Sequence, residues 1–146
     1  MSTAMNNIAL AISLQVLAHS QFICAEEPES SEISLVGSWE VVSRIYNGKA
    51  RDVGSIFEFL PKGQLTVIKA DGRRVASSYS LDSSQSPARI SWWDGNFKLV
   101  GICKMEGGNL VVCGRVVGKN SNDKGPDEFS SNWFSGHFLT TFSQRK

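Results

Sequence analysis

The stretch Leu35-Val36-Gly37-Ser38-Trp39-Glu40-Val41-Val42 decides how this chain folds. Successive side chains of an extended chain point to opposite faces, so Trp39 and Val41 share one face while Glu40 and Arg44 share the other. One face is therefore apolar and the other mostly polar, which is typical of a half-buried β-strand. A helix would place Glu40 and Arg44 beside Val41 instead. The pattern predicts a strand.

Gly37 and Trp39 form a G-x-W step at the front of this strand. A glycine two residues before a Trp lets another backbone approach closely, or lets the strand bend. The step therefore favours a large aromatic at the mouth of a closing sheet. An ordinary core Trp beside an ordinary loop glycine is the alternative, because a short motif alone carries little information.

The first 25 residues have the composition of a targeting segment. Residues 1–25 contain no Asp, Glu, Lys or Arg, residues 8–17 are largely apolar, and acidic chain follows directly after Ala25. This pattern is typical of a secretory signal peptide, although its start lacks the usual Lys or Arg. Polar residues break the apolar run well short of the ~20 residues that a transmembrane span needs. We expect export to the periplasm or the extracellular space, with cleavage near Ala25.

Behind the leader we expect a flexible acidic tether at 26–34 and a single domain at 35–146. The formal net charge of +1 is unchanged by removal of the leader, since the leader holds no charged side chain. A net charge so close to zero gives no reason to expect nucleic acid or an anionic membrane as a partner.

Turn residues punctuate the domain at short and regular intervals, as at Asn47-Gly48, Asp71-Gly72 and Gly107-Gly108. Between the turns lie runs rich in β-branched and aromatic residues. The predicted strands span 35–46, 53–60, 64–70, 73–81, 89–93, 97–105, 110–117 and 138–142. Tight consecutive turns favour antiparallel pairing between neighbours, and eight such strands can close into an up-and-down barrel without exposed edges. The expected fold class is therefore all-β, an eight-stranded antiparallel barrel.

The alternation of side chains also predicts which residues face the interior. The face is ambiguous at Phe57 and Phe59 against Ile56, and at Trp92 against Trp93. The inward residues predicted in this way are Trp39, Val41, Phe57 or Phe59, Leu65, Val67, Val75, Tyr79, Ile90, Trp92, Leu99, Cys103, Met105, Leu110 and Val112.

Three stretches of the chain resemble a planctomycete family of small exported domains of unknown function. They are residues 35–49, residues 79–90 and, most specifically, residues 101–113, which are similar to the family's G-I-Y…G-D-x-L…C hairpin. Cys103 stands where that family usually has Tyr. The resemblance implies a lipocalin-like barrel over residues 35–146. It also implies that Gly37, Trp39 and the terminal Arg145 have the barrel-closing structural role known from lipocalins, and it implies no particular ligand.

Residues for catalysis or metal binding are few, so the sequence predicts no enzyme, no metal site and no cofactor. His137 is the only histidine after the leader, and structural zinc needs four ligands while catalytic zinc needs three. Asp127 and Glu128 form an acidic pair in a loop, where carboxylates usually cap and solvate the chain. The chain contains no G-x-S-x-G elbow.

Two function classes remain open. The first is a binding module, since an eight-stranded barrel can hold one small apolar ligand. Its tentative ligand-binding residues are Phe59, Leu65, Tyr79 and Met105, placed on strand ends away from Trp39, with the Tyr79 hydroxyl orienting the ligand. The second class is a structural or interaction protein of the cell envelope, with a solid core and an envelope protein as partner. A cavity of a few hundred Å³ would favour the first class.

The two cysteines behind the leader, Cys103 and Cys113, could form a disulfide in an oxidising compartment. A hairpin that turns at Gly107-Gly108 pairs residue 103 with residue 112, so that Cys113 points to the opposite side of the sheet. Only a bulge at Asn109 would bring the thiols together. We expect two free thiols.

Overall fold

A computed structural model describes residues 33–51, 53–130 and 136–146, and the predicted leader and most of the predicted tether lie outside these residues. The described chain is built from strands, with one 3-10 turn, η2 (Pro61–Gly63). The strands are β1 (Gly37–Tyr46), β2 (Lys49–Ala50), β3 (Ile56–Leu60), β4 (Gln64–Ile68), β5 (Arg74–Asp82), β6 (Ala88–Asp94), β7 (Phe97–Glu106), β8 (Asn109–Gly118) and β9 (Phe138–Gln144). Within the described residues, no helix is long and apolar enough to cross a membrane.

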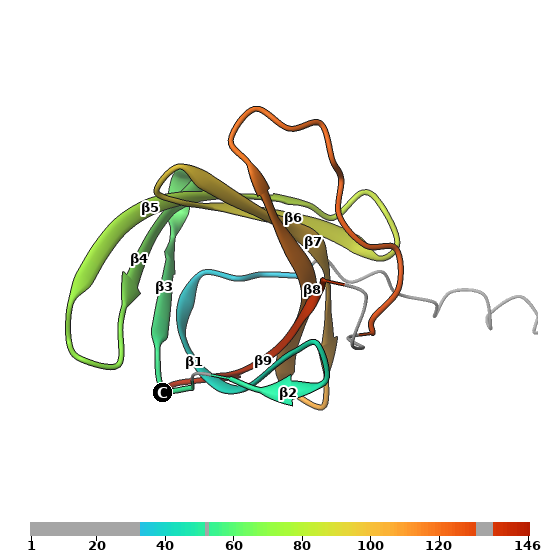
Figure 1. The fold of residues 1–146 in the computed structure, drawn as a ribbon. Helices are drawn as coiled ribbons and strands as arrows, with labels where there is room; N and C mark the ends of the chain where they lie inside the picture. The colour runs from blue at the N-terminus through green and yellow to red at the C-terminus, as the bar shows by residue number, and fades with distance from the viewer. Residues whose placement is uncertain (1–32, 52, 131–135) are drawn as a thin grey trace, which may run out of the picture. The chain divides into compact units, whose positions relative to one another are not determined.

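Eight of these strands close into an antiparallel barrel, which confirms the predicted fold class (Figure 1). From β3 onward each strand pairs with the next, and β1 pairs with β3 on one edge and with β9 on the other. The closing register sets Val41 opposite Phe142. The remaining strand, β2, has two residues and pairs only with the end of β1.

The predicted turns form at the expected places. Asn47 and Gly48 have φ of 52° and 77°, and Gly107 and Gly108 have φ of 61° and 86°. Two successive positive φ values are the signature of the tight hairpin turn that matches the twist of the flanking strands. The register across the second turn is regular, with Glu106 opposite Asn109. No bulge forms at Asn109.

The interior of the barrel is filled mainly by the residues that alternation predicts. Both Phe57 and Phe59 face inward, whereas Met105, predicted inward, is 41% exposed because it lies at the end of β7. Three core residues were not predicted, Leu35, Ala88 and Phe142. The buried core consists of Leu35, Trp39, Val41, Phe57, Phe59, Leu65, Val67, Ala88, Ile90, Trp92, Leu99, Cys103, Leu110, Val112 and Phe142.

Trp39 lies at a closed end of the barrel, 2% exposed. Its indole Nε1 donates a hydrogen bond of 2.9 Å to the carbonyl of Leu35, and both Leu35 and Ile33 pack on the core. Contact with the barrel therefore begins inside the predicted tether. Arg145 differs from the role that the resemblance implied: its side chain is exposed, and its backbone amide donates to Ser38. The chain before β1 closes this end.

The cysteines are free, as predicted. Cys103 faces Val112 across the ladder and belongs to the interior core, whereas Cys113 faces Ile102 and lies on the outer side of the sheet. Burial raises the pKa of the Cys103 thiol to about 11 and also raises that of Cys113. Both thiols therefore stay protonated near neutral pH.

A second, smaller buried layer lies on the outside of β7 and β8. Val100, Ile102 and Val111 point away from the interior, yet none is more than 7% exposed. The segment after β8 runs along this outer face (Figure 1). Gly125 approaches so closely that a Cβ there would lie 2.6 Å from the Val100 carbonyl oxygen.

Candidate functional site

The barrel has a cavity of about 130 Å³ at the end opposite Trp39. It forms where β3, β7 and β9 begin and where β4, β6 and β8 end, so its walls come from residues far apart in sequence. The lining residues are Arg44, Ser55, Phe57, Val67, Lys69, Val75, Ser77, Trp92, Trp93, Leu99, Val116 and Phe138.

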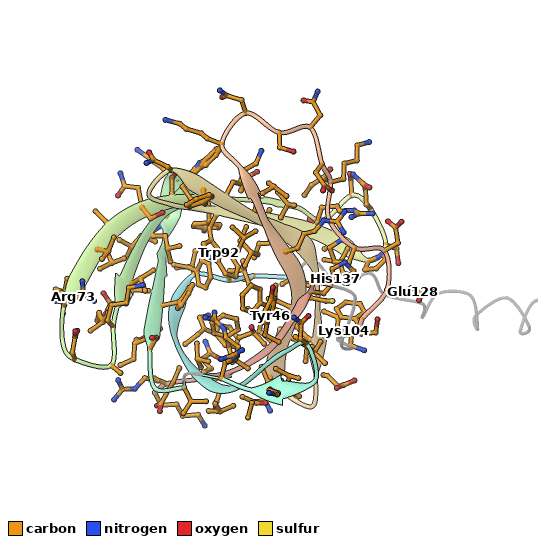
Figure 2. All side chains as sticks on the ribbon, in the orientation of Figure 1. Tyr46, Arg73, Trp92, Lys104, Glu128 and His137 are labelled. Atoms are coloured by element: carbon orange, nitrogen blue, oxygen red, sulfur yellow. The ribbon has the colours of Figure 1, made fainter. Side chains whose placement is uncertain are left out.

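Aromatic rings hold the apolar side of this cavity in place. Phe57 contacts Trp92 edge to face, with ring centroids 5.3 Å apart, and contacts Phe142 with centroids 5.0 Å apart. Figure 2 shows Trp92 directed into the ring of strands. Edge-to-face packing fixes the orientation of each ring, so the aromatic wall is preformed.

Two cations, Arg44 and Lys69, line the same cavity, and no Asp or Glu is among the lining residues that the structure describes. Arg44 donates from Nε to the Thr140 hydroxyl at 3.2 Å, and its guanidinium carbon lies 5.4 Å from the centroid of the Phe138 ring. These contacts orient the guanidinium. Among the described lining residues, the cavity therefore combines an apolar wall with two cationic side chains.

The predicted ligand residues lie at the other end of the barrel, so the expectation that they stand away from Trp39 is wrong. Phe59 pairs with Gly37, two residues from Trp39, and Leu65 pairs with Phe59. The physical reason is the antiparallel order: β1 starts at the closed end, so β3 finishes there. Phe59 and Leu65 are at most 1% exposed and fill that end.

The other two predicted residues also lie outside the cavity. Tyr79 donates its hydroxyl to the Leu60 carbonyl at 3.1 Å, and its ring meets Phe59 edge to face at 4.9 Å. Met105 is exposed at the end of β7, next to the turn. The structure brings Phe59, Leu65 and Tyr79 together, but as packing around the closed end.

The alternating direction of successive strands was the signal in the sequence that could have identified the residues lining the cavity. In an up-and-down barrel the end of one strand and the start of the next share one end of the barrel. Applied to the predicted strands, this rule places Arg44, Trp92 and Phe138 together at the end away from Trp39, whereas Phe57 pairs with Trp39 and also lines the cavity.

His137 belongs to an ion-pair cluster on the outer side of the barrel. Arg115 donates from Nε and Nη2 to the two carboxylate oxygens of Asp123, at 2.9 and 2.7 Å, and Arg115 Nη1 lies 3.0 Å from His137 Nε2. Because a guanidinium can only donate, Nε2 must accept, and the imidazole is neutral. Burial and the neighbouring Arg115 lower the pKa of His137. Both Asp123 oxygens accept hydrogen bonds from Arg115.

The acidic pair Asp127 and Glu128 is exposed, and Asp127 forms an ion pair with Arg89. Within residues 33–51, 53–130 and 136–146, no three His, Cys, Asp or Glu side chains come together in a way that could hold a metal ion.

Comparison of the chain with protein-family models, with curated proteins and with solved structures finds no match. The function is therefore inferred from the geometry of the barrel.

Proposed function

We propose that this protein is a lipocalin-like binding module that takes one small, flat, apolar anion into the open end of its barrel. The observation that carries the proposal is the cavity itself, in which Trp92 and Phe57 provide the apolar wall and Arg44 and Lys69 are the charged residues among the described lining. An aromatic carboxylate has the matching chemistry, with a ring for the wall and two oxygens for the guanidinium.

The volume limits the size of the ligand. Drug-sized ligands need pockets of about 300–1,000 Å³, so a cavity of about 130 Å³ is too small for a fatty acid or a retinoid. An engineered cavity of about 150 Å³ in another protein holds one benzene molecule. A single ring is therefore the largest body that enters without rearrangement.

The expected affinity is moderate. A ring that removes about 120 Å² of apolar surface from water gains about 3 kcal/mol. A hydrogen bond to the Arg44 cation adds about 1.5–3 kcal/mol. Because association also costs translational and rotational freedom, these contributions set an upper limit on the affinity, a Kd no tighter than about 0.05 mM.

Titration with benzoate, followed through tryptophan fluorescence, tests the proposal, because Trp92 and Trp93 both line the cavity. We expect saturable one-to-one quenching, with benzyl alcohol binding about tenfold more weakly because it lacks the charge. Arg44→Gln should weaken benzoate binding about tenfold. Val75→Phe should abolish binding by filling the cavity.

Arg73→Gln is the matched control. Arg73 is exposed at the tip of the hairpin between β4 and β5, where it pairs with Asp71 and does not line the cavity (Figure 2). Its variant should bind benzoate as the native protein does. Absence of saturable binding to folded protein, shown by circular dichroism, would favour the alternative of an envelope interaction protein with a packed core.

We also propose that the domain is exported, with residues 1–25 acting as its signal peptide. Support comes from the uncharged apolar leader and the acidic chain that follows it. Mass analysis of protein from the producing cells should find a mature chain that begins near Glu26. Recovery of the chain with an intact Met1 from the cytoplasm alone would contradict this proposal.

A further inference from the structure

We propose that the outer wall of the barrel carries a second binding site, for a small molecule that joins an oxyanion to a short apolar tail. The site is a groove of about 250 Å³ between the strands β5–β7 and the segment after β8. It is separate from the cavity at the open end and shares no lining residue with it. The lining residues are Ser80, Asp82, Gln85, Arg89, Ile90, Ser91, Val100, Gly101 and Lys124.

Arg89 builds one wall of the groove by fixing the segment that carries Lys124. Its Nη1 donates to the carbonyls of Lys124 and Pro126, at 3.1 and 3.0 Å, and its Nη2 donates to the Asp127 carboxylate. These contacts cross 35 or more residues of sequence. The wall therefore exists before any ligand arrives.

Asp123 anchors the same segment from its other side. Its carboxylate accepts the backbone amide of Gly125 at 2.8 Å as well as the two bonds from Arg115. Gly125 has φ of 86° and lies against the Val100 carbonyl, where a side chain would clash. A preformed groove loses little conformational entropy when a ligand binds.

Hydrogen-bond donors converge on this groove. Ser80 and Ser91 are cross-strand partners of β5 and β6 and both line it, so two hydroxyls lie next to each other. Lys124 adds an ammonium that has no ion-pair partner among the described residues. Arg89 uses three of its five N–H groups on the loop, which leaves two for a ligand.

Asp82 is the one carboxylate among the described lining residues, and its oxygens are already engaged. They accept from the Ser84 amide and hydroxyl and from the Gln85 side chain. These bonds, first that of the Ser84 hydroxyl, lower the pKa of Asp82. The lining thus offers two hydroxyls, the Lys124 ammonium and the Arg89 guanidinium beside one carboxylate that is already engaged, which favours a ligand with acceptor oxygens.

Val100 provides the apolar part of the groove. It is the cross-strand partner of Ser91 and is 5% exposed. A purely apolar ligand would leave the Lys124 and serine donors without acceptors, whereas a short apolar tail on an oxyanion can lie against Ile90 and Val100. A short-chain carboxylate satisfies both demands.

Butyrate is a suitable probe, with butyramide as its uncharged counterpart. Titration of ¹⁵N-labelled full-length protein should give saturable amide shifts at Ser91, Val100 and Lys124. Butyramide should bind at least about fivefold more weakly, since solvent screening reduces the contribution of an exposed charge. Lys124→Gln should weaken butyrate binding by about the same factor. Lys119→Gln, an exposed lysine of the same segment outside the groove, should leave binding unchanged.

The Arg44→Gln variant distinguishes binding in the groove from binding in the cavity at the open end, because Arg44 lines only that cavity. Shifts at Ser91 and Lys124 that persist in Arg44→Gln support the groove, whether or not benzoate binds at the open end. Equal affinity for butyrate and butyramide, shifts that never saturate, or shifts confined to residues around Phe138 would each overturn the inference.

Discussion

Gly101→Ala tests how closely β7 and β8 approach each other. Gly101 lies opposite Gly114 in the ladder, so two glycines face each other inside the barrel. A Cβ at position 101 would lie 2.1 Å from the Cys113 carbonyl oxygen and 2.6 Å from the Gly114 Cα. Both atoms belong to the backbone, which cannot rotate aside. The methyl group can be accommodated only if the two strands separate.

The size of the effect follows from this geometry. The Cβ–O contact is more than about 1 Å shorter than a van der Waals contact, and overpacking a core costs about 1–3 kcal/mol, occasionally more. Because relief requires movement of paired strands, we expect a loss of at least about 3 kcal/mol in the free energy of unfolding. Ala restricts the unfolded chain more than Gly does, and this effect offsets at most about 1 kcal/mol of the expected loss in stability.

Thermal and urea unfolding followed by circular dichroism measure this loss. For a domain of this size the melting temperature should fall by about 10 °C or more. Gly118→Ala is the matched control, since Gly118 ends the same strand β8 and a Cβ there meets nothing within 4 Å. We expect its stability to change by less than about 0.5 kcal/mol. Equal melting temperatures for Gly101→Ala and the native protein would refute the close approach of β7 and β8.

Other parts of the barrel give further expectations. Trp39→Ala should lower the free energy of unfolding by about 3–5 kcal/mol, because it empties the closed end; an unchanged urea midpoint would contradict this. Arg115 lowers the pKa of Asp123 to about 2, below its ordinary 3.8, so the stabilising ion pair is complete above pH 3.8 and is lost as the pH falls toward 2. Asp123→Asn should therefore flatten the acid-unfolding curve in that window, and a curve identical to that of the native protein would argue against the pair. Thiol titration of the mature chain should find Cys103 and Cys113 unreactive until denaturant is added and both free afterwards, whereas rapid reaction of Cys103 in native protein would show an open interior.

Much of the fold follows from local patterns in the sequence. Strand positions and turns were predictable because side-chain alternation and the positive φ of Asn-Gly and Gly-Gly pairs act within a few residues. The same alternation placed Cys103 and Cys113 on opposite sides of the sheet, and the register confirms it. Predictions failed at strand ends, as at Met105, where the pattern does not say how far burial extends.

The candidate sites depend on contacts between residues far apart in the chain. Arg44, Trp92 and Phe138 meet at one end of the barrel only because eight strands alternate in direction and then close. Arg89 reaches the 124–127 segment through a guanidinium that no periodic pattern marks as special. Alternation determines which face a side chain takes, and that property is local. Which ends and loops come together is set by barrel closure and by long-range pairing, so only the tertiary structure decided where a ligand could bind.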